Sequence, residues 1–272
     1  MSSGNGEQDN AARDAFDPKA LVSYYEQSMY DPLIREYMGH GDFHNFGYWD
    51  TETRSHEAAS EDLMEALLDL VPCKQGKILD VACGKGATTR YLLKYYAAQD
   101  VTGINVSDKQ LETAKQNAPG CTFLWMDASD LRFPAGSFDT VICVEAAFHF
   151  DTREVFLREA HRVLRQDGWL VLSDILVTRE AERRRIGRTE RNYVADPEAY
   201  RALLERTGFT RIRVIDATVP CWHGLYHSVV TFGHQKFLAK EIELAELERL
   251  LDPTYHRVPD LTYYLMAAAQ KG

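Results

Sequence analysis

The chain has 272 residues, a formal net charge of −10 and 45% hydrophobic residues. This length suits one large α/β domain, or one domain with a lid, with ample apolar content for a core. The negative charge argues against nucleic acid as a partner, because nucleic-acid enzymes usually present a basic stripe. No apolar run reaches membrane-spanning length, no signal-peptide pattern opens the chain, and the five cysteines show no paired spacing. We therefore expect no membrane span and a cytoplasmic location with reduced thiols.

The first quarter of the chain predicts a tail, two helices and an aromatic loop. Residues 1–15 are small and polar, which is typical of a disordered tail. An amphipathic helix is predicted over 17–38, an aromatic loop over 39–50 and a helix over 56–70. We treat 16–72 as an N-terminal lid with its helices.

Strand and helix patterns then alternate, as in a parallel sheet covered by helices on both faces. Strands are predicted at 77–82, 100–105, 122–126, 139–144 and 168–175, and helices at 87–97, 108–117 and 153–165. After residue 178 a helix to about residue 207, a strand at 210–218 and a last strand at 261–269 are predicted. Residues 219–259 form an insertion between the last two predicted strands.

A glycine-rich turn follows the first strand of this series. Gly84 and Gly86 let backbone amides approach a ligand at the N-terminus of the next helix. The run Asp80-Val81-Ala82-Cys83-Gly84-Lys85-Gly86 resembles the S-adenosylmethionine (SAM) loop of class I methyltransferases, usually Asp-Val-Gly-Cys-Gly-Xaa-Gly, with Ala82 replacing its first glycine. A dinucleotide loop, which here lacks its third glycine, and a tight turn without a ligand are the alternatives.

The next strand and helix narrow the resemblance. The run from Gly103 to Gln110 resembles the branch of tocopherol methyltransferases, sugar O-methyltransferases and cyclopropane fatty acid synthases. In that branch the residues matching Asn105 and Gln110 contact SAM, although Gln110 also reads as a surface helix residue. An NAD enzyme usually has an acid at Asn105, so a dehydrogenase is disfavoured.

The resemblance implies a Rossmann-like α/β fold: a seven-stranded, mostly parallel sheet with helices on both faces and an antiparallel closing edge. The SAM-binding core would span 73–218, a substrate-cap insertion 219–259 and the last core strand 260–272. Asp127 would accept from the adenine amino group, or would simply cap a turn. The rings of Tyr25 and Trp49 would surround the sulfonium cation, or would only pack a helix onto the core. The complete expected cofactor set is Tyr25, Trp49, Asp80, Ala82, Gly84, Gly86, Asn105, Val106, Gln110, Asp127, Ala128 and Glu145.

Candidate catalytic and acceptor-binding residues follow the fourth strand and lie in the insertion. His149 is the first candidate for a general base, or a packed histidine that shapes the pocket, and His44 stands behind it. Cyclopropane synthases have a glutamate at the position of Phe148, so cyclopropanation is disfavoured. The expected acceptor-binding residues are Tyr24, Phe148, Trp222, His223, Tyr226 and His227. His223 and His227 have a helical metal-pair spacing, but no acid joins them and we expect no metal.

Together these patterns predict a SAM-dependent methyltransferase acting on a small, natural-product-like acceptor, with S-adenosylhomocysteine as the cofactor product. Oxygen is the favoured nucleophile because His149 is available to take a proton. Methylation of nitrogen or carbon, an NAD-dependent oxidoreductase and a SAM-binding protein without chemistry are the alternatives. The arginine-rich stretch 179–191 reads as a solvated helix face or an anion-binding lid face, and a homodimer is left open.

Overall fold

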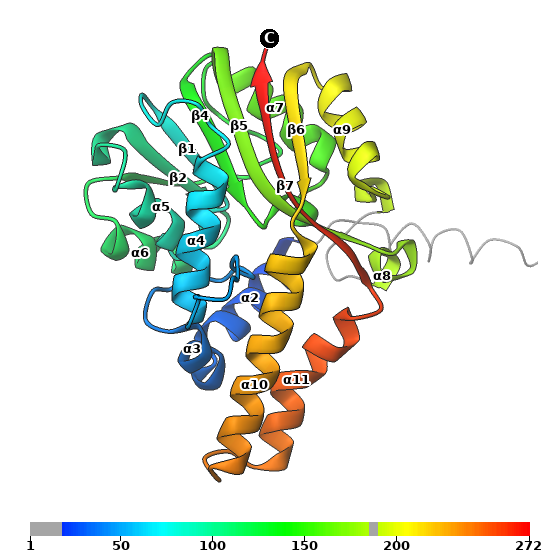
Figure 1. Ribbon diagram of the computed structural model, residues 1–272. Helices are drawn as coiled ribbons and strands as arrows, with labels where there is room; N and C mark the ends of the chain where they lie inside the picture. The colour runs from blue at the N-terminus through cyan, green and yellow to red at the C-terminus, as the bar shows by residue number, and fades with distance from the viewer. Residues whose placement is uncertain (1–17, 185–189) are drawn as a thin grey trace, which may run out of the picture.

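A seven-stranded sheet organises the chain in the computed structural model, which describes residues 18–184 and 190–272 (Figure 1). Its strand order is β3-β2-β1-β4-β5-β7-β6, and only β7 runs antiparallel to its neighbours. The strands are β1 (Ile78–Val81), β2 (Val101–Asn105), β3 (Thr122–Trp125), β4 (Phe138–Val144), β5 (Leu164–Val177), β6 (Phe209–Asp216) and β7 (Leu261–Lys271). The predicted fold class is confirmed, while the predicted tail 1–15 lies outside the described residues.

Helices cover both faces of this sheet. One face packs on α4 (His56–Leu68) and α5 (Ala87–Leu92), and the other on α7 (Arg153–Val163) and α9 (Pro197–Arg206). Consecutive β1 residues Ile78 and Leu79 are buried in the two different clusters, which explains why this strand shows no polar alternation. The remaining core elements are α6 (Asp108–Asn117), α8 (Arg179–Arg184) and the short turns Ala98–Asp100, Ala147–His149 and Glu190–Asn192.

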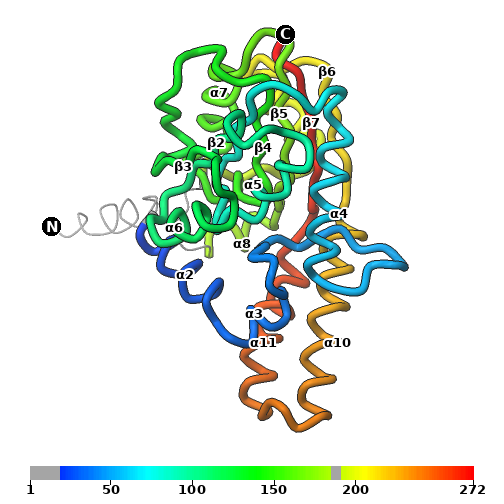
Figure 2. Tube along the Cα trace, turned by 90° about the vertical axis from the view of Figure 1, so that its left-hand side faces the viewer, coloured from blue at the N-terminus to red at the C-terminus, as the bar shows by residue number. Residues whose placement is uncertain are grey.

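Two further groups of helices lie at the carboxyl ends of the parallel strands (Figures 1 and 2). The first is α2 (Pro18–Tyr30) and α3 (Pro32–Met38), where the sequence predicted one helix over 17–38. The helix breaks because the Asp31 side chain accepts from the Leu33 and Ile34 amides at 3.0 Å and Pro32 starts a new first turn.

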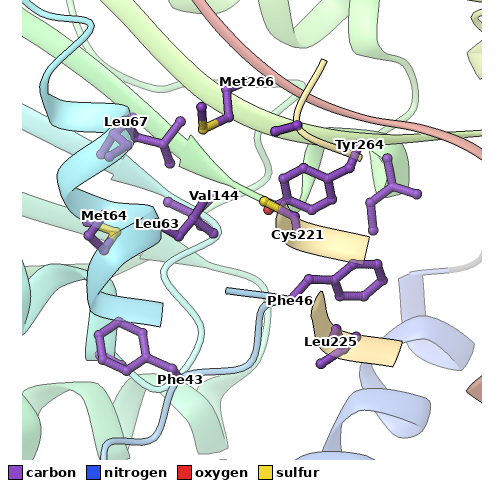
Figure 3. Close-up of a cluster of buried hydrophobic side chains, with 14 of the residues drawn as sticks. Phe43, Phe46, Leu63, Met64, Leu67, Val144, Cys221, Leu225, Tyr264 and Met266 are labelled. Atoms are coloured by element: carbon purple, nitrogen blue, oxygen red, sulfur yellow. The ribbon is translucent and has the colours of Figure 1, made fainter. Parts of the chain in front are cut away.

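The second group is the segment between β6 and β7. It forms a π-helical turn (Val219–His223) and a hairpin of two helices, α10 (Gly224–Leu238) and α11 (Leu244–Arg257), which projects away from the sheet (Figure 2). A shared apolar cluster joins it to the body of the protein, as Figure 3 shows. In that cluster Phe46 of the aromatic loop lies between Leu225 of α10 and Tyr264 of β7, and Phe43 of the same loop lies beside Met64 of α4. The loop and the hairpin are therefore held in place by one core.

Within the described part of the chain, no helix is both long and apolar enough to cross a membrane.

Candidate functional site

Two adjoining cavities lie at the carboxyl ends of the strands, where ligands bind in open α/β sheets. The loop cavity, next to the glycine-rich turn, encloses about 1090 Å³ including its mouth. The hairpin cavity, between α2, α3 and α11, encloses about 1730 Å³. Six residues line both cavities and define the junction between them: Leu21, Tyr25, His44, Asn45, Glu145 and His149.

The glycine-rich turn presents bare backbone to the loop cavity. Ala82 and Gly84 both have left-handed backbone angles, with φ of 60° and 54°. A Cβ atom placed on Gly84 would lie 3.8 Å from Gln110 Oε1 and Met29 Cε and would meet no other atom within 4 Å. Gly84 therefore leaves open a space that a side chain would fill, directly above the peptide groups of the loop.

Asp80 and Gly86 shape this loop from beneath and do not line the cavity. The Asp80 carboxylate accepts from the hydroxyls of Thr88 and Thr89 at 2.7 and 2.6 Å, which docks the start of α5. Burial raises the pKa of Asp80 to about 6, although these hydrogen bonds oppose the shift. A Cβ atom on Gly86 would lie 2.8 Å from Ala114 Cα, so glycine is needed for α5 to approach α6.

Polar groups after β2 and β3 line the opposite wall of the loop cavity. Asn105 Nδ2 donates to Gln110 Oε1 at 2.7 Å, and Asn105 Oδ1 accepts from the Val106 amide at 2.9 Å. Asp127 Oδ1 accepts from the Ser129 amide at 2.7 Å, so one carboxylate oxygen caps the local turn. Asp127 and the buried Ala128 both line the cavity.

An ion pair between the buried Lys85 and the half-buried Asp42 connects the glycine-rich turn to the aromatic loop. Asp42 also accepts from Asn117 Nδ2 at 3.0 Å, and Lys85 lies over the Tyr30 ring with its Nζ 5.4 Å from the centroid. Burial pushes the pKa of Asp42 upward, but the bonds from Lys85 and Asn117 outweigh it and hold the pKa below its usual value. Both residues line the loop cavity, and Lys85 Nζ lies 3.4 Å from the Met29 carbonyl near the end of α2.

Aromatic and imidazole rings meet at the junction of the cavities. Tyr25 Oη lies 2.5 Å from His149 Nε2, and their rings are perpendicular. The His44 ring lies 5.6 Å from that of Tyr25, and its Nδ1 is 3.1 Å from Met38 Sδ. Burial, helped by nearby positive charges, lowers the pKa of His44 to about 3, so its imidazole is neutral at physiological pH.

Glu145 completes the junction at the end of β4. Its Oε2 accepts from the Phe46 amide at 2.8 Å and from the Tyr264 hydroxyl at 2.9 Å. Burial raises the pKa of Glu145 to about 8 in spite of these bonds and of the nearby Arg257. The carboxyl group is therefore largely protonated near neutral pH.

The hairpin cavity has mainly apolar walls and three arginines. Tyr24 and Phe148, which the sequence singled out, line it, as do Leu225 and Val229 of α10. The arginines are Arg184, Arg249 and Arg257. Of the arginine-rich stretch 179–191, residues 185–189 lie outside the described residues.

Besides Asp80 and Gly86, five residues predicted to contact ligands line neither cavity. Trp49 Nε1 donates to the Phe46 carbonyl at 2.8 Å, and a Cβ atom on Gly224 would lie 2.4 Å from Trp49 Cβ, so Trp49 packs against the start of α10. Trp222 is buried against Phe46, with ring centroids 5.5 Å apart. The other three are the half-buried Tyr226 and the exposed His223 and His227. No group of three potential metal ligands occurs among residues 18–184 and 190–272.

Sequence reasoning missed Lys85, Asp42 and Arg257. Lys85 is a charged residue between Gly84 and Gly86, and its position inside the turn could have indicated a contact with the N-terminal lid. Arg257 gave no signal, because α11 is an amphipathic helix and its charged residues are typical of a solvated face.

Comparisons with known proteins show which family and which fold this chain shares. The family described as "Methyltransferase domain" matches residues 79–172. The 27-O-demethylrifamycin SV methyltransferase of Amycolatopsis mediterranei is 31% identical over 243 residues, which cover 82% of this chain and 88% of the relative. O-methyltransferase rstn1 of Aspergillus nomiae is 31% identical over 71% of this chain and 89% of its own. The cyclopropane synthase MmaA2 from Mycobacterium tuberculosis shares the fold, with a TM-score of 0.72 at 19% identity over 94% of this chain and 99% of that one.

Proposed function

Since this chain belongs to the SAM-dependent methyltransferases that act on small molecules, we propose that it methylates an oxygen atom of a natural-product-like acceptor. When bound, SAM supplies an electrophilic methyl group on a positively charged sulfur. The observation that carries the proposal is the Tyr25–His149 pair, which places an imidazole nitrogen where the two cavities meet.

The loop cavity fits SAM by the chemistry of its walls. The open space above Gly84 lets the ligand approach the backbone of residues 82–84, and Asn105 and Gln110 offer amide groups. The second carboxylate oxygen of Asp127 would accept from an adenine amino group, beside the Ala128 amide. Tyr25 and Glu145 would border the methyl group, because both line the junction. Asp80, Gly86 and Trp49 would act indirectly, by holding the loop and the hairpin in place.

The hairpin cavity would hold the acceptor. Apolar walls with a few polar groups are typical of small-molecule sites, and Tyr24 and Phe148 would contribute to them. The two cavities share the junction residues, so an acceptor in the hairpin cavity would have its reacting atom beside His149. The main contribution of the protein to catalysis would be to align the acceptor atom with the methyl group of SAM, while α2 and the aromatic loop exclude water.

With its Nε2–H donating to Tyr25 Oη, which would fix the orientation of the ring, His149 would accept the proton of the acceptor hydroxyl at Nδ1. His44 is the weaker candidate, since a pKa of about 3 makes its imidazole a poor proton acceptor at neutral pH. The names of both relatives, 27-O-demethylrifamycin SV methyltransferase and O-methyltransferase rstn1, also refer to methylated oxygens.

The test is incubation with SAM that carries an isotopically heavy methyl group, in a broad metabolite extract, followed by untargeted mass spectrometry. We expect a product whose fragments place the heavy methyl on oxygen, formed about 100-fold more slowly or slower still by His149→Ala. A label on nitrogen or carbon would overturn the assignment to oxygen and leave an N- or C-methyltransferase.

A further inference from the structure

The charges of the hairpin cavity are not all balanced. Arg184 pairs with Asp260 at 2.7 Å, and Arg249 pairs with Asp31 at 2.6 Å. Each of these arginines therefore has a carboxylate of its own, and together they add little net charge to the cavity.

Arg257, at the end of α11, differs from the other two. It is half-buried, it lines the cavity, and its Cζ lies 5.8 Å from the centroid of the Phe46 ring. Among residues 18–184 and 190–272, no carboxylate lies within ion-pair distance of its guanidinium and no hydrogen bond engages it. It contributes one positive charge that the described residues leave unpaired.

The groups at the junction do not neutralise this charge. The charge of Arg257 acts on both Glu145 and His44, lowering the pKa of each. His44 is neutral, and Glu145 keeps its proton near neutral pH because burial dominates. A guanidinium partly removed from water with no anionic partner is energetically unfavourable, and a bound anion relieves that cost.

We propose that Arg257 is a specificity-determining residue that binds a carboxylate on the methyl acceptor, an inference that rests on the proposed acceptor role of the hairpin cavity. The guanidinium presents a planar fork that matches a carboxylate with two parallel hydrogen bonds. Leu225 and Val229 contribute apolar wall to the same cavity, so the acceptor is a mostly apolar molecule with one acidic group. The unpaired charge also disfavours ammonium acceptors, which fits oxygen as the nucleophile.

The experiment compares two fluorescent probes that differ only in this group. Dansylaminoundecanoate and its methyl ester are titrated into the full chain saturated with S-adenosylhomocysteine, and the dissociation constants are read from dansyl fluorescence. We expect the carboxylate to bind about tenfold more tightly than the ester, which is the effect of one charge-assisted contact. Arg257→Gln removes that preference and leaves the affinity for the ester unchanged.

Two further variants separate the role of Arg257 from a general effect of charge or folding. Arg257→Lys keeps the charge without the fork and retains part of the preference. Arg249→Gln is the matched control, because Arg249 is already paired with Asp31, and it leaves the preference in place. Equal binding of the two probes by the wild-type chain, or an unchanged preference in Arg257→Gln with a normal thermal midpoint, would overturn the inference.

This test is independent of methyl transfer. A product labelled on nitrogen or carbon, together with an Arg257-dependent preference for the carboxylate probe, would refute the O-methylation proposal alone. A product labelled on oxygen, formed equally well by Arg257→Gln, would refute the role of Arg257 alone.

Discussion

Tyr25 and His149, separated by 124 positions in the chain, come together with the tyrosine hydroxyl oxygen 2.5 Å from His149 Nε2. Tyr25 belongs to α2, whereas His149 ends the short turn after β4. The N-terminal helix therefore completes a centre whose other parts come from the sheet. An imidazole held in this way has a fixed ring orientation, which proton transfer requires.

Replacing His149 should separate chemistry from cofactor binding. We expect His149→Ala to lower the turnover by about 100-fold or more, the range of a lost general base, and to change the affinity for S-adenosylhomocysteine little. Tyr25→Phe should have a smaller effect, because the imidazole remains. Steady-state kinetics and calorimetry measure the two quantities, and unchanged turnover in His149→Ala would reduce this residue to a packing role.

Substitutions of the two loop glycines should have opposite consequences. The side chain of Gly84→Val enters the open loop cavity, so S-adenosylhomocysteine binding should be abolished at a modest cost in stability from the left-handed backbone. Gly86→Val places its Cβ 2.8 Å from Ala114, so that variant should lose stability first. Calorimetry and thermal unfolding are compared side by side. Wild-type cofactor affinity in Gly84→Val contradicts the assignment of the loop.

Glu145 should make the stability of the protein depend on pH. Its pKa in the folded state, about 8, is above the ordinary value of 4.5, so the folded state holds this proton more tightly than the unfolded chain. Its contribution to stability is therefore complete below about pH 4.5 and is lost as the pH rises through about 8. Glu145→Gln keeps two hydrogen-bond acceptor sites and does not titrate, so it should gain stability relative to wild type over that range. Urea unfolding at about pH 5 and about pH 9 tests this, and parallel curves would refute it.

Loss of the Lys85–Asp42 pair should loosen the lid. Lys85→Met leaves Asp42 partly buried without its cation, which should cost about 3 kcal/mol of unfolding free energy. The control is Lys94→Met, since Lys94 pairs with Glu61 in an exposed position and should cost less than about 1 kcal/mol. Urea titration gives both values. Faster release of S-adenosylhomocysteine is expected only in Lys85→Met, and equal rates in the two variants would contradict a role for this pair in closing the loop cavity.

Local patterns in the sequence were enough to predict the sheet and the position of the glycine-rich turn. β1 is buried on both faces, which explains its sequence of consecutive buried residues. The prediction of one helix over 17–38 overlooked a capping signal, Asp31 followed by Pro32, that marks the start of α3. The orientation of side chains in the hairpin could not be predicted. Leu225 and Val229 face the cavity while His223 and His227 face solvent, because the packing of α10 against Trp49 sets its rotation. The position of Arg257 in the cavity wall likewise depends on tertiary packing and could not be predicted from the local sequence.

The walls of the hairpin cavity come almost entirely from outside residues 79–172, the window that matches the methyltransferase domain. Among its described lining residues, only Glu145, Phe148 and His149 fall inside that window. Selection can therefore rework α3 and the α10–α11 hairpin for new acceptors while Tyr25 of α2 and His149 keep the transfer centre the same. In engineering terms the hairpin is a module for exchange: a chimera that receives another hairpin should inherit its donor's acceptor preference and keep its own affinity for SAM.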